Sequence, residues 1–402
     1  MQWSESYDPS TNGDLINLAQ GVPGAPPPAR VLELLAQSSS DPSTTRYGDL
    51  RGDSGLREEF CKDVNTVYGA DVDSDAENVI TSGANLAFAV TVLGLAKTGE
   101  EIILPTPWYF NNEMQMTMLG IKTVPLVCQA PTFQPDPSTC RRLITNKTRA
   151  IVLVSPNNPT GAIYSHELLQ EFAALAKEFK IALVLDETYR DFLPEGYRPH
   201  DLFSDPSWRQ YLIQLFSFSK VCLGNVDKCS LAALEQTNRS YAIPGHRLGS
   251  IIGPQPFMQQ LHKALDCFQI CPARPAQRVL EWSISNTRQW REATRDEILI
   301  RQRVFKDVIA NECRETGWKV CVGGGYFAYV MHPFERVSSE EVAKELASKV
   351  GVVVLPGTFF SPGFEDVDQD RYLRFSIANV DVDTLRKVPS RLNKLVEMWS
   401  SL

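Results

Sequence analysis

The chain has 402 residues, enough for two domains or for one large domain with a smaller satellite. Hydrophobic residues make up 43% of it and charged residues 22%, which is typical of a water-soluble globular protein. Its net charge of -8 disfavours binding to nucleic acid or to an anionic membrane, and no apolar stretch reaches transmembrane length.

The first residues and the cysteines indicate a cytoplasmic protein. Residues 1–7 lack the basic and apolar regions of a secretory signal. The nine cysteines, an odd number, show no Cys-x-x-Cys spacing and stand mostly in apolar or helical-looking stretches. We therefore expect buried free thiols in a reducing compartment. Cys267 and Cys271 have no matching histidines, so we expect no metal site.

Short apolar runs alternate with amphipathic stretches through the middle of the chain. Residues 167–179 carry leucine, phenylalanine and alanine at helical spacing. The apolar runs predict buried strands at residues 78–80, 101–104, 150–154, 181–185, 212–216 and 250–252. This alternation predicts an α/β fold with a mainly parallel sheet covered on both faces. In such sheets, ligands bind at the carboxyl ends of the strands.

The two ends of the chain differ from this middle. Residues 21–30 are rich in proline and cannot enter a central strand. Residues 285–315 have the length and charge mix of a long, partly exposed helix, and residues 323–330 open an antiparallel-looking section that runs to the C-terminus. Both chain ends would build the smaller domain. The predicted parts are an N-terminal arm with part of the small domain (1–45), a large domain (46–283) and a small C-terminal domain (284–402).

Two ionisable residues follow predicted strands directly. Lys220 ends the sequence Ser-Phe-Ser-Lys behind the run 212–216. A lysine there is poorly hydrated and easily deprotonated, which suits a Schiff-base amine, although most lysines are solvated surface charges. Asp186 follows the run 181–185, where a carboxylate can keep the pyridine nitrogen of pyridoxal 5'-phosphate (PLP) protonated. An aspartate that caps a helix is the equally supported alternative.

Two turns add groups that PLP requires. Residues 155–161 follow a strand, and their prolines and glycine fix a turn that presents Asn158 as a two-way hydrogen-bonding side chain. Residues 81–85 lead into an apolar helix, so their amides could hold a phosphate at its N-terminus. Turns without function can be built from the same residues.

Taken together, these residues resemble the fold-type I PLP-dependent aminotransferases of class I/II, which include aspartate and kynurenine aminotransferases. The resemblance extends from about Leu18 to Ala378. Five motifs in the family's order make coincidence very improbable. They are Asn-Pro-Thr-Gly (158–161), Asp-Glu-x-Tyr (186–189), Ser-Phe-Ser-Lys (217–220), Gly-x-Arg-x-Gly (245–249) and Leu-Arg-Phe-Ser (373–376).

The resemblance implies catalytic and cofactor-binding roles for these residues. Lys220 would carry PLP as a Schiff base and would move the proton between the substrate Cα and the cofactor C4'. Asp186 would pair with the pyridine nitrogen, while Asn158 and Tyr189 would hold the ring oxygen. The phosphate would be bound by Gly83, Ala84, Asn85, Ser217, Ser219 and Arg247.

Further roles concern stacking, the substrate and assembly. Tyr109 would stack on the ring, unless the neighbouring Trp108 does, and both could be core aromatics. Arg374 would hold the substrate α-carboxylate as a bidentate fork, with a surface ion pair as the alternative. Gly21 would let the backbone approach the substrate. Tyr47 matches the position from which this family sends a tyrosine into the neighbouring subunit's phosphate site, so a homodimer with shared active sites is implied.

The implied reaction moves an amino group between an L-amino acid and a 2-oxo acid. Carbon–sulfur β-elimination and cyclopropane-forming γ-elimination, as in an ACC-synthase-like enzyme, share every cofactor contact and stay open. Trp3, Trp108, Tyr109 and the pair Phe359-Phe360 hint at an aromatic pocket, but core packing explains them equally well.

One departure from the family is large. The arginine of Gly-x-Arg usually follows the lysine by about eight residues, whereas here the separation is 247 − 220 = 27. The excess of 19 residues lies mainly at 221–239. A surface loop and a retained intron translated in frame both explain it, and we favour the intron because lysine and arginine must converge on one cofactor here. A catalytically impaired PLP-fold protein is the third possibility.

Sequencing the transcript separates these explanations, because the intron hypothesis fails if every mature message encodes residues 222–240. If the segment belongs to the protein, we predict weakened PLP binding and low activity, since small displacements of positioned groups reduce rates strongly. The measurement is PLP content with and without the segment, and equal occupancy would contradict the prediction.

Overall fold

The computed structural model describes residues 2–22, 27, 29–197, 199–220, 244–363 and 370–400, without the side chains of residues 11 and 12. The inserted segment 221–239 lies outside the described residues, as does part of the proline-rich arm.

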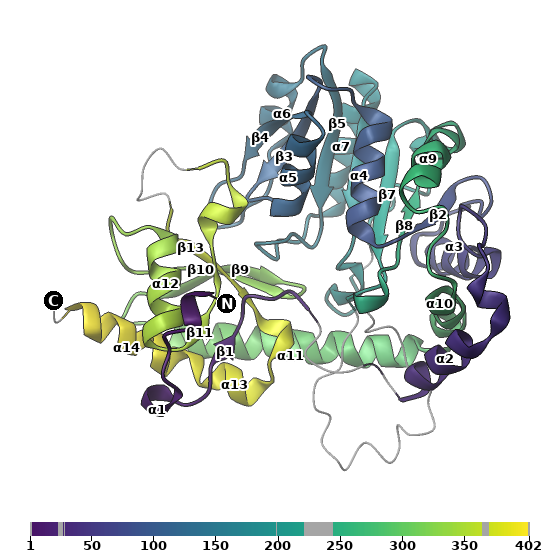
Figure 1. Cartoon of the computed structure of the whole chain (residues 1–402). Coiled ribbons are helices and arrows are strands. Elements are labelled where there is room, and N and C mark those ends of the chain that lie inside the picture. The colour runs from purple at the N-terminus through teal and green to yellow at the C-terminus, as the bar shows by residue number, and fades with distance from the viewer. Residues whose placement is uncertain are drawn as a thin grey trace.

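A seven-stranded sheet forms the centre of the larger part of the molecule (Figure 1). Its strands follow the order β2-β8-β7-β6-β5-β3-β4. Strand β8 is antiparallel to both neighbours, and the other adjacent pairs are parallel. The strands are β2 (Asn78–Thr81), β3 (Glu101–Thr106), β4 (Lys122–Val127), β5 (Thr148–Val154), β6 (Ala182–Asp186), β7 (Leu212–Ser217) and β8 (Gly249–Ile252).

Six of these strands confirm the predicted apolar runs, and β4 was not predicted. Strand β4 lies at the sheet edge, where most of its residues are at least partly exposed. It also contains Lys122 and Pro125. An edge strand tolerates proline and polar residues because one side of its backbone forms no ladder. Its sequence therefore lacks the continuous apolar run of a buried parallel strand.

Helices cover both faces of the sheet, because successive strand residues point to opposite faces. Ile151 and Leu153 pack into one core, whereas Val152 packs into the other. The first core receives α3 (Ser54–Tyr68), α6 (Pro137–Leu143), α7 (His166–Phe179) and α10 (Arg274–Asn286). The second receives α4 (Ala84–Leu95), α5 (Phe110–Met118) and α9 (Gln255–Phe268). The predicted helix 167–179 is thus confirmed as α7.

A separate core joins the N-terminal residues to the C-terminal part. Ile16 and Leu18 pack there with residues between 298 and 395. Strand β1 (Ile16–Asn17) pairs in parallel with β11 (Val352–Val353). A four-stranded antiparallel sheet has the order β12-β13-β10-β9. Its strands are β9 (Lys319–Gly324), β10 (Phe327–Met331), β12 (Leu355–Pro356) and β13 (Tyr372–Ser376).

The described residues contain further helices. Helix α11 (Arg288–Glu312) confirms the predicted long helix and runs below the large sheet towards α10 (Figure 1). The other α-helices are α1 (Pro9–Asn12), α2 (Ala29–Ser40), α12 (Ser339–Lys349), α13 (Val382–Arg386) and α14 (Val388–Ser400). Short 3-10 helices are η1 (Gln2–Ser4), η2 (Pro42–Thr45), η3 (Arg190–Phe192), η4 (Pro206–Gln210), η5 (Pro244–His246), η6 (Gly357–Phe360) and η8 (Ile377–Asn379).

Two sequence expectations need correction or stay open. The antiparallel hairpin exists, but residues 323 and 324 end β9 and the turn lies at Gly325-Tyr326. The chain then ends in helices rather than in antiparallel strands, because the apolar positions of 382–400 recur at helical spacing. The predicted domain boundaries stay a prediction.

The described cysteines agree with the sequence analysis only in part. All seven described cysteines are free, and Cys61, Cys128, Cys140 and Cys313 are buried. Cys267 is exposed, contrary to the expectation for most thiols, because it lies near the C-terminal end of amphipathic α9. Within the described ranges, no helix is long and apolar enough to span a membrane.

Gly161, in the turn after β5, lies against the backbone of Gly324 at the end of β9, and this close approach gives a stability prediction. Its φ is +75°, and a Cβ there would collide with the backbone nitrogen of Gly324. Gly196 has a similar φ of +73°, but a Cβ there would meet no described atom within 4 Å. We expect Gly196→Ala to lower the free energy of unfolding by about 1 kcal/mol through backbone strain alone. Gly161→Ala should cost roughly 1–3 kcal/mol more, and equal losses in denaturant titrations would contradict this.

Candidate active site

A cavity of about 590 Å³ opens at the carboxyl ends of β5, β6 and β7. Parallel strands place their final side chains at one edge of the sheet, so residues far apart in sequence meet there. Most of the predicted site residues line this cavity. They are Gly21, Ala84, Asn85, Tyr109, Asn158, Asp186, Tyr189, Ser217, Ser219, Lys220, Arg247 and Arg374.

Lys220 provides an amine that is easily deprotonated. Its Nζ atom donates a hydrogen bond to the Gly21 carbonyl oxygen at 2.7 Å. Burial, aided by the positive charges of Arg374 and Arg247, lowers the pKa of the Lys220 amine to about 8, although Asp186 opposes this shift. Such an amine can act as a nucleophile and a proton carrier close to neutral pH.

Asp186 presents a buried carboxylate to the cavity from the end of β6. Its Oδ1 atom accepts hydrogen bonds from the Thr188 amide at 3.0 Å and from the Thr188 hydroxyl at 2.6 Å. The following helix η3 begins at Arg190, so the helix-capping interpretation of Asp186 is wrong. Burial raises the pKa of Asp186 above its ordinary value despite the bonds from Thr188. A cationic group in the cavity would therefore be a favourable partner for this carboxylate.

Asn158 and Tyr189 both line the cavity wall. The Asn158 Oδ1 atom accepts a hydrogen bond from Arg374 Nη1 at 2.9 Å. Burial raises the pKa of the Tyr189 hydroxyl, although Asn158 acts to lower it, so this hydroxyl stays protonated and can donate. The pair can therefore bind an oxygen atom of a ligand.

The start of α4 forms a cradle for an anion. Gly83 caps this helix with a φ of 92°, and a Cβ there would lie 2.6 Å from Nη2 of Arg247. Glycine thus lets the guanidinium approach the helix N-terminus. The cavity is lined at this helix and at the end of β7 by Ala84, Asn85, Ser217 and Ser219. Helix amides, hydroxyls and a guanidinium are groups that bind phosphate.

Arg374 is a buried cation in β13. Its guanidinium carbon lies 4.7 Å from the ring centre of Phe327 and 5.2 Å from that of Phe360. Nη1 and Nη2 donate to Asn158 and to the Ala19 carbonyl, while Nε has no partner among the described residues. Burial lowers the pKa of Arg374 to about 10. The surface ion-pair interpretation is wrong, and a carboxylate ligand would compensate this charge.

The remaining predicted residues differ in their relation to the cavity. Tyr109 lines it, whereas Trp108 is buried in the core below α4 and α5. A Cβ at Gly21 would lie 2.9 Å from the Phe327 ring, so any larger residue would have to displace that ring or the backbone. Tyr47 is 79% exposed and does not line this chain's cavity.

Several lining residues were not predicted. Thr188 stands inside the Asp-Glu-x-Tyr motif, and its spacing from Asp186 could have revealed its hydrogen bonds. Leu355 comes from a distant segment without a local signal. Phe360, one of the aromatic residues that hinted at a pocket, lies against the Arg374 guanidinium but is not among the lining residues. The other unpredicted lining residues are Ala19, Gln20, Val22, Phe110, Asn112, Val154 and Pro244. The described residues contain no cluster of three histidine, cysteine or acidic side chains suited to a metal ion.

Comparisons with known proteins agree with this geometry. The family model for aminotransferase class I and II matches residues 13–392. The aromatic aminotransferase ISS1 of Arabidopsis thaliana is 26% identical over 392 residues, covering 95% of this chain and 90% of its own. A probable N-succinyldiaminopimelate aminotransferase, DapC, of Mycobacterium tuberculosis is 27% identical over 394 residues, covering 95% and 92%.

Solved structures give the same result for the fold. The N-succinyldiaminopimelate aminotransferase from Mycobacterium tuberculosis has a TM-score of 0.82 at 27% identity, covering 95% of this chain and 93% of that one. The aromatic aminotransferase from Pyrococcus horikoshii has a TM-score of 0.82 at 24% identity, covering 98% of both chains, and supports the fold alone. Because the family model spans nearly the whole sequence, this protein belongs to the class I and II aminotransferases, with their fold-type I architecture.

Proposed function

We propose that this protein is a PLP-dependent aminotransferase that moves an amino group between an L-amino acid and a 2-oxo acid. One observation carries the proposal. A lysine of lowered pKa, a buried carboxylate, an anion cradle and a buried arginine, which has no acidic partner among the described residues, converge on one cavity. Membership of the aminotransferase family supports the same reaction.

The residues of the cavity fit PLP. The cradle at Gly83 and Arg247 suits its phosphate, and the carboxylate of Asp186 suits its pyridine nitrogen. Asn158 and Tyr189 suit its ring oxygen. When bound, PLP supplies an aldehyde carbon for covalent attachment and a ring that accepts electrons from the substrate Cα.

The chain's own groups would then bind the substrate and move its proton. Arg374 would hold the α-carboxylate as a bidentate fork, which fixes the position of Cα. Lys220 would remove the Cα proton and carry it to the cofactor carbon C4', because about a tenth of an amine with a pKa near 8 is unprotonated at pH 7. Asn158 interacts with both Arg374 and Tyr189. It would therefore connect the arginine that holds the substrate carboxylate with the tyrosine that holds the ring oxygen.

We also propose a homodimer with shared active sites. The exposed side chain of Tyr47 does not line its own chain's cavity, as expected for a residue that reaches a neighbouring subunit. Phe268 and Ile270 are 60% and 46% exposed. The Gly48 amide donates a hydrogen bond to the Cys271 sulfur at 3.3 Å. The segment that contains Phe268 and Ile270 therefore lies beside the loop of Tyr47. Exposed apolar side chains of this kind mark contact surfaces. The cytoplasmic location stays a prediction.

The reaction is tested with a panel of amino donors against pyruvate, 2-oxoglutarate and phenylpyruvate, using proteins with and without residues 221–239. An aminotransferase forms the new amino acid only when a 2-oxo acid is supplied. Release of ammonia without any acceptor would instead favour an eliminating enzyme. Reduction of the PLP-loaded protein with borohydride should label the tryptic fragment that carries Lys220, and no label there would refute the proposal.

The lowered pKa of Lys220 predicts the pH dependence of this labelling. Only the unprotonated amine attacks the aldehyde, so labelling of the apoprotein at Lys220 should fall as the pH drops below about 8. The peptide carrying exposed Lys180 provides the internal comparison. The measurement is quantitative peptide mapping after trapping at each pH. A midpoint near the ordinary lysine value of about 10.4 would contradict the burial of this amine.

Arg374→Lys tests the carboxylate site. A lysine keeps the charge but loses the fork, so kcat/KM for the amino donor should fall about 100-fold. PLP content should stay close to that of the wild type. Arg371→Lys is the control, because Arg371 donates to the His332 carbonyl at 2.8 Å and does not line the cavity. Equal kinetics of the two variants would contradict the assignment of Arg374.

A further inference from the structure

The side chains of the segment from Asp186 to Arg190 point in two directions, some into the cavity and others into the protein interior. Asp186 and Tyr189 line the cavity. Glu187 and Arg190 do not line it, yet each is only 4% exposed. A buried glutamate and a buried arginine are unusual, because charged groups lose their hydration when they are buried.

Glu187 is surrounded by hydrogen-bond donors. Its Oε2 atom accepts hydrogen bonds from the Tyr68 hydroxyl at 2.7 Å and from Gln214 Nε2, and it lies 3.2 Å from His200 Nε2. Gln214 also donates to the Tyr68 hydroxyl at 2.9 Å. Burial opposes ionisation of Glu187, but His200 and these donors outweigh it and hold the pKa of its carboxyl below the ordinary value. The carboxylate is therefore fixed from several directions.

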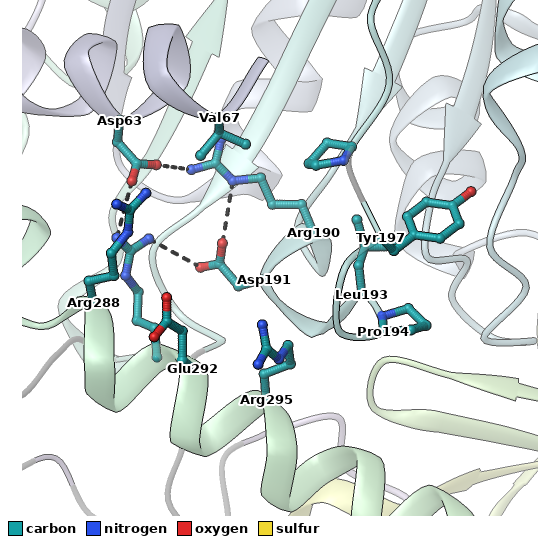
Figure 2. A pocket seen from close by; sticks show the side chains of 12 residues that line it. Asp63, Val67, Arg190, Asp191, Leu193, Pro194, Tyr197, Arg288, Glu292 and Arg295 are labelled. Carbon is teal, nitrogen blue, oxygen red and sulfur yellow. Dashed lines mark hydrogen bonds and ion pairs between the residues drawn. The ribbon is translucent and has the colours of Figure 1, made fainter. Parts of the chain in front are cut away.

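Arg190 is held beside this network, at the wall of a second cavity of about 180 Å³. Figure 2 shows its guanidinium between Asp63 and Asp191. Asp63 also accepts from Arg291 of α11 at 3.1 Å. The guanidinium carbon of Arg190 lies 4.4 Å from the ring centre of Phe216 in β7. Arg190 thus connects the turn after β6 to α3, α11 and β7.

Main-chain hydrogen bonds hold the backbone between Glu187 and the residues that line the cavity. The Glu187 amide donates to the Leu215 carbonyl at 2.9 Å, and the Ser155 amide donates to the Asp186 carbonyl at 3.0 Å. The Arg190 amide closes the turn by donating to the Glu187 carbonyl at 3.0 Å. The peptide units on both sides of Glu187 are therefore tied down, and they carry Asp186 and lead to Tyr189.

Stability alone does not account for these buried charges, because apolar residues of similar volume often stabilise a protein equally well. We propose that Glu187 is a positioning residue, whose bonds to Tyr68, His200 and Gln214 hold the turn that presents Asp186 and Tyr189 to the cofactor. The inference rests on the proposed function. A side chain that must bind a ligand atom with an accuracy of a fraction of an ångström requires neighbouring hydrogen bonds that fix its backbone.

Glu187→Gln tests the inference in the full chain, because glutamine keeps the shape and removes the charge that its donors hold. We expect PLP affinity to fall about tenfold and kcat to fall roughly 10- to 100-fold. The visible circular dichroism of bound PLP should weaken, because the ring is held less firmly. Tyr68→Phe removes one donor only and should cause a smaller change in the same direction. In the double variant the effects should be less than additive, since both act on one network.

Glu77→Gln is the matched control. Glu77 is also 4% exposed and accepts hydrogen bonds from Arg209 Nη2 at 3.0 Å and from the Asp73 amide at 2.9 Å, but it does not line the cavity. Its replacement should lower the melting temperature of the apoprotein and leave PLP affinity within about twofold of the wild type. If Glu187→Gln behaves in the same way, with an unchanged dichroism signal, Glu187 is merely structural and the inference is overturned. Failure of the wild-type protein to bind PLP would overturn the proposed function itself.

Discussion

Uncompensated positive charge inside the cavity is the constraint on which the site depends. Lys220 and Arg374 both lie there, and among the described acidic residues only Asp186 lines the same space. The lowered pKa values of the lysine and the arginine have burial as their main cause. Charges removed from water are stable only when they are paired, so this cavity favours anions such as a phosphate and a carboxylate. Burial, aided by the neighbouring positive charges, also keeps a fraction of the lysine amine unprotonated.

Because side chains alternate along a strand, cavity-lining residues lie on one face of the strand ends and core-packing residues lie on the other. Ser217 and Ser219 line the cavity, whereas Phe216 and Phe218 point to the opposite side and pack against Phe60, with ring centres 5.1 Å from it. Asp186 and Glu187 divide in the same way. Each strand end therefore has one face that lines the cavity and one face that is packed in the core (the anchored side), within a few residues of each other. A substitution on the anchored side can act on the cavity without touching a ligand.

The sequence predicted the central strands well, because a parallel strand buried on both faces is a nearly continuous apolar run. It did not predict β4, whose edge position permits Pro125. The motif residues were predicted by resemblance, whereas the surroundings of Arg374 were not, apart from Phe360 as a possible pocket aromatic. Phe327, Phe360 and the Ala19 carbonyl come from separate parts of the chain and meet only in the folded protein. Contacts between such distant segments leave no local pattern to read.

The pairing of β7 with β8 explains how Lys220 and Arg247 meet despite their wide spacing. The Phe218 amide donates to the Leu248 carbonyl at 3.1 Å, and Ser217 pairs with Gly249. Of the 29 residues between Phe218 and Leu248, removal of 221–239 would leave 10, which is ample because hairpin connections need only about two to five. The sheet register therefore positions the lysine and the arginine, and the length of the connection does not. The displacement of positioned groups that motivated the prediction of weakened PLP binding is therefore not supported by the strand register. Any effect of residues 221–239 on PLP binding would have to arise from those residues themselves.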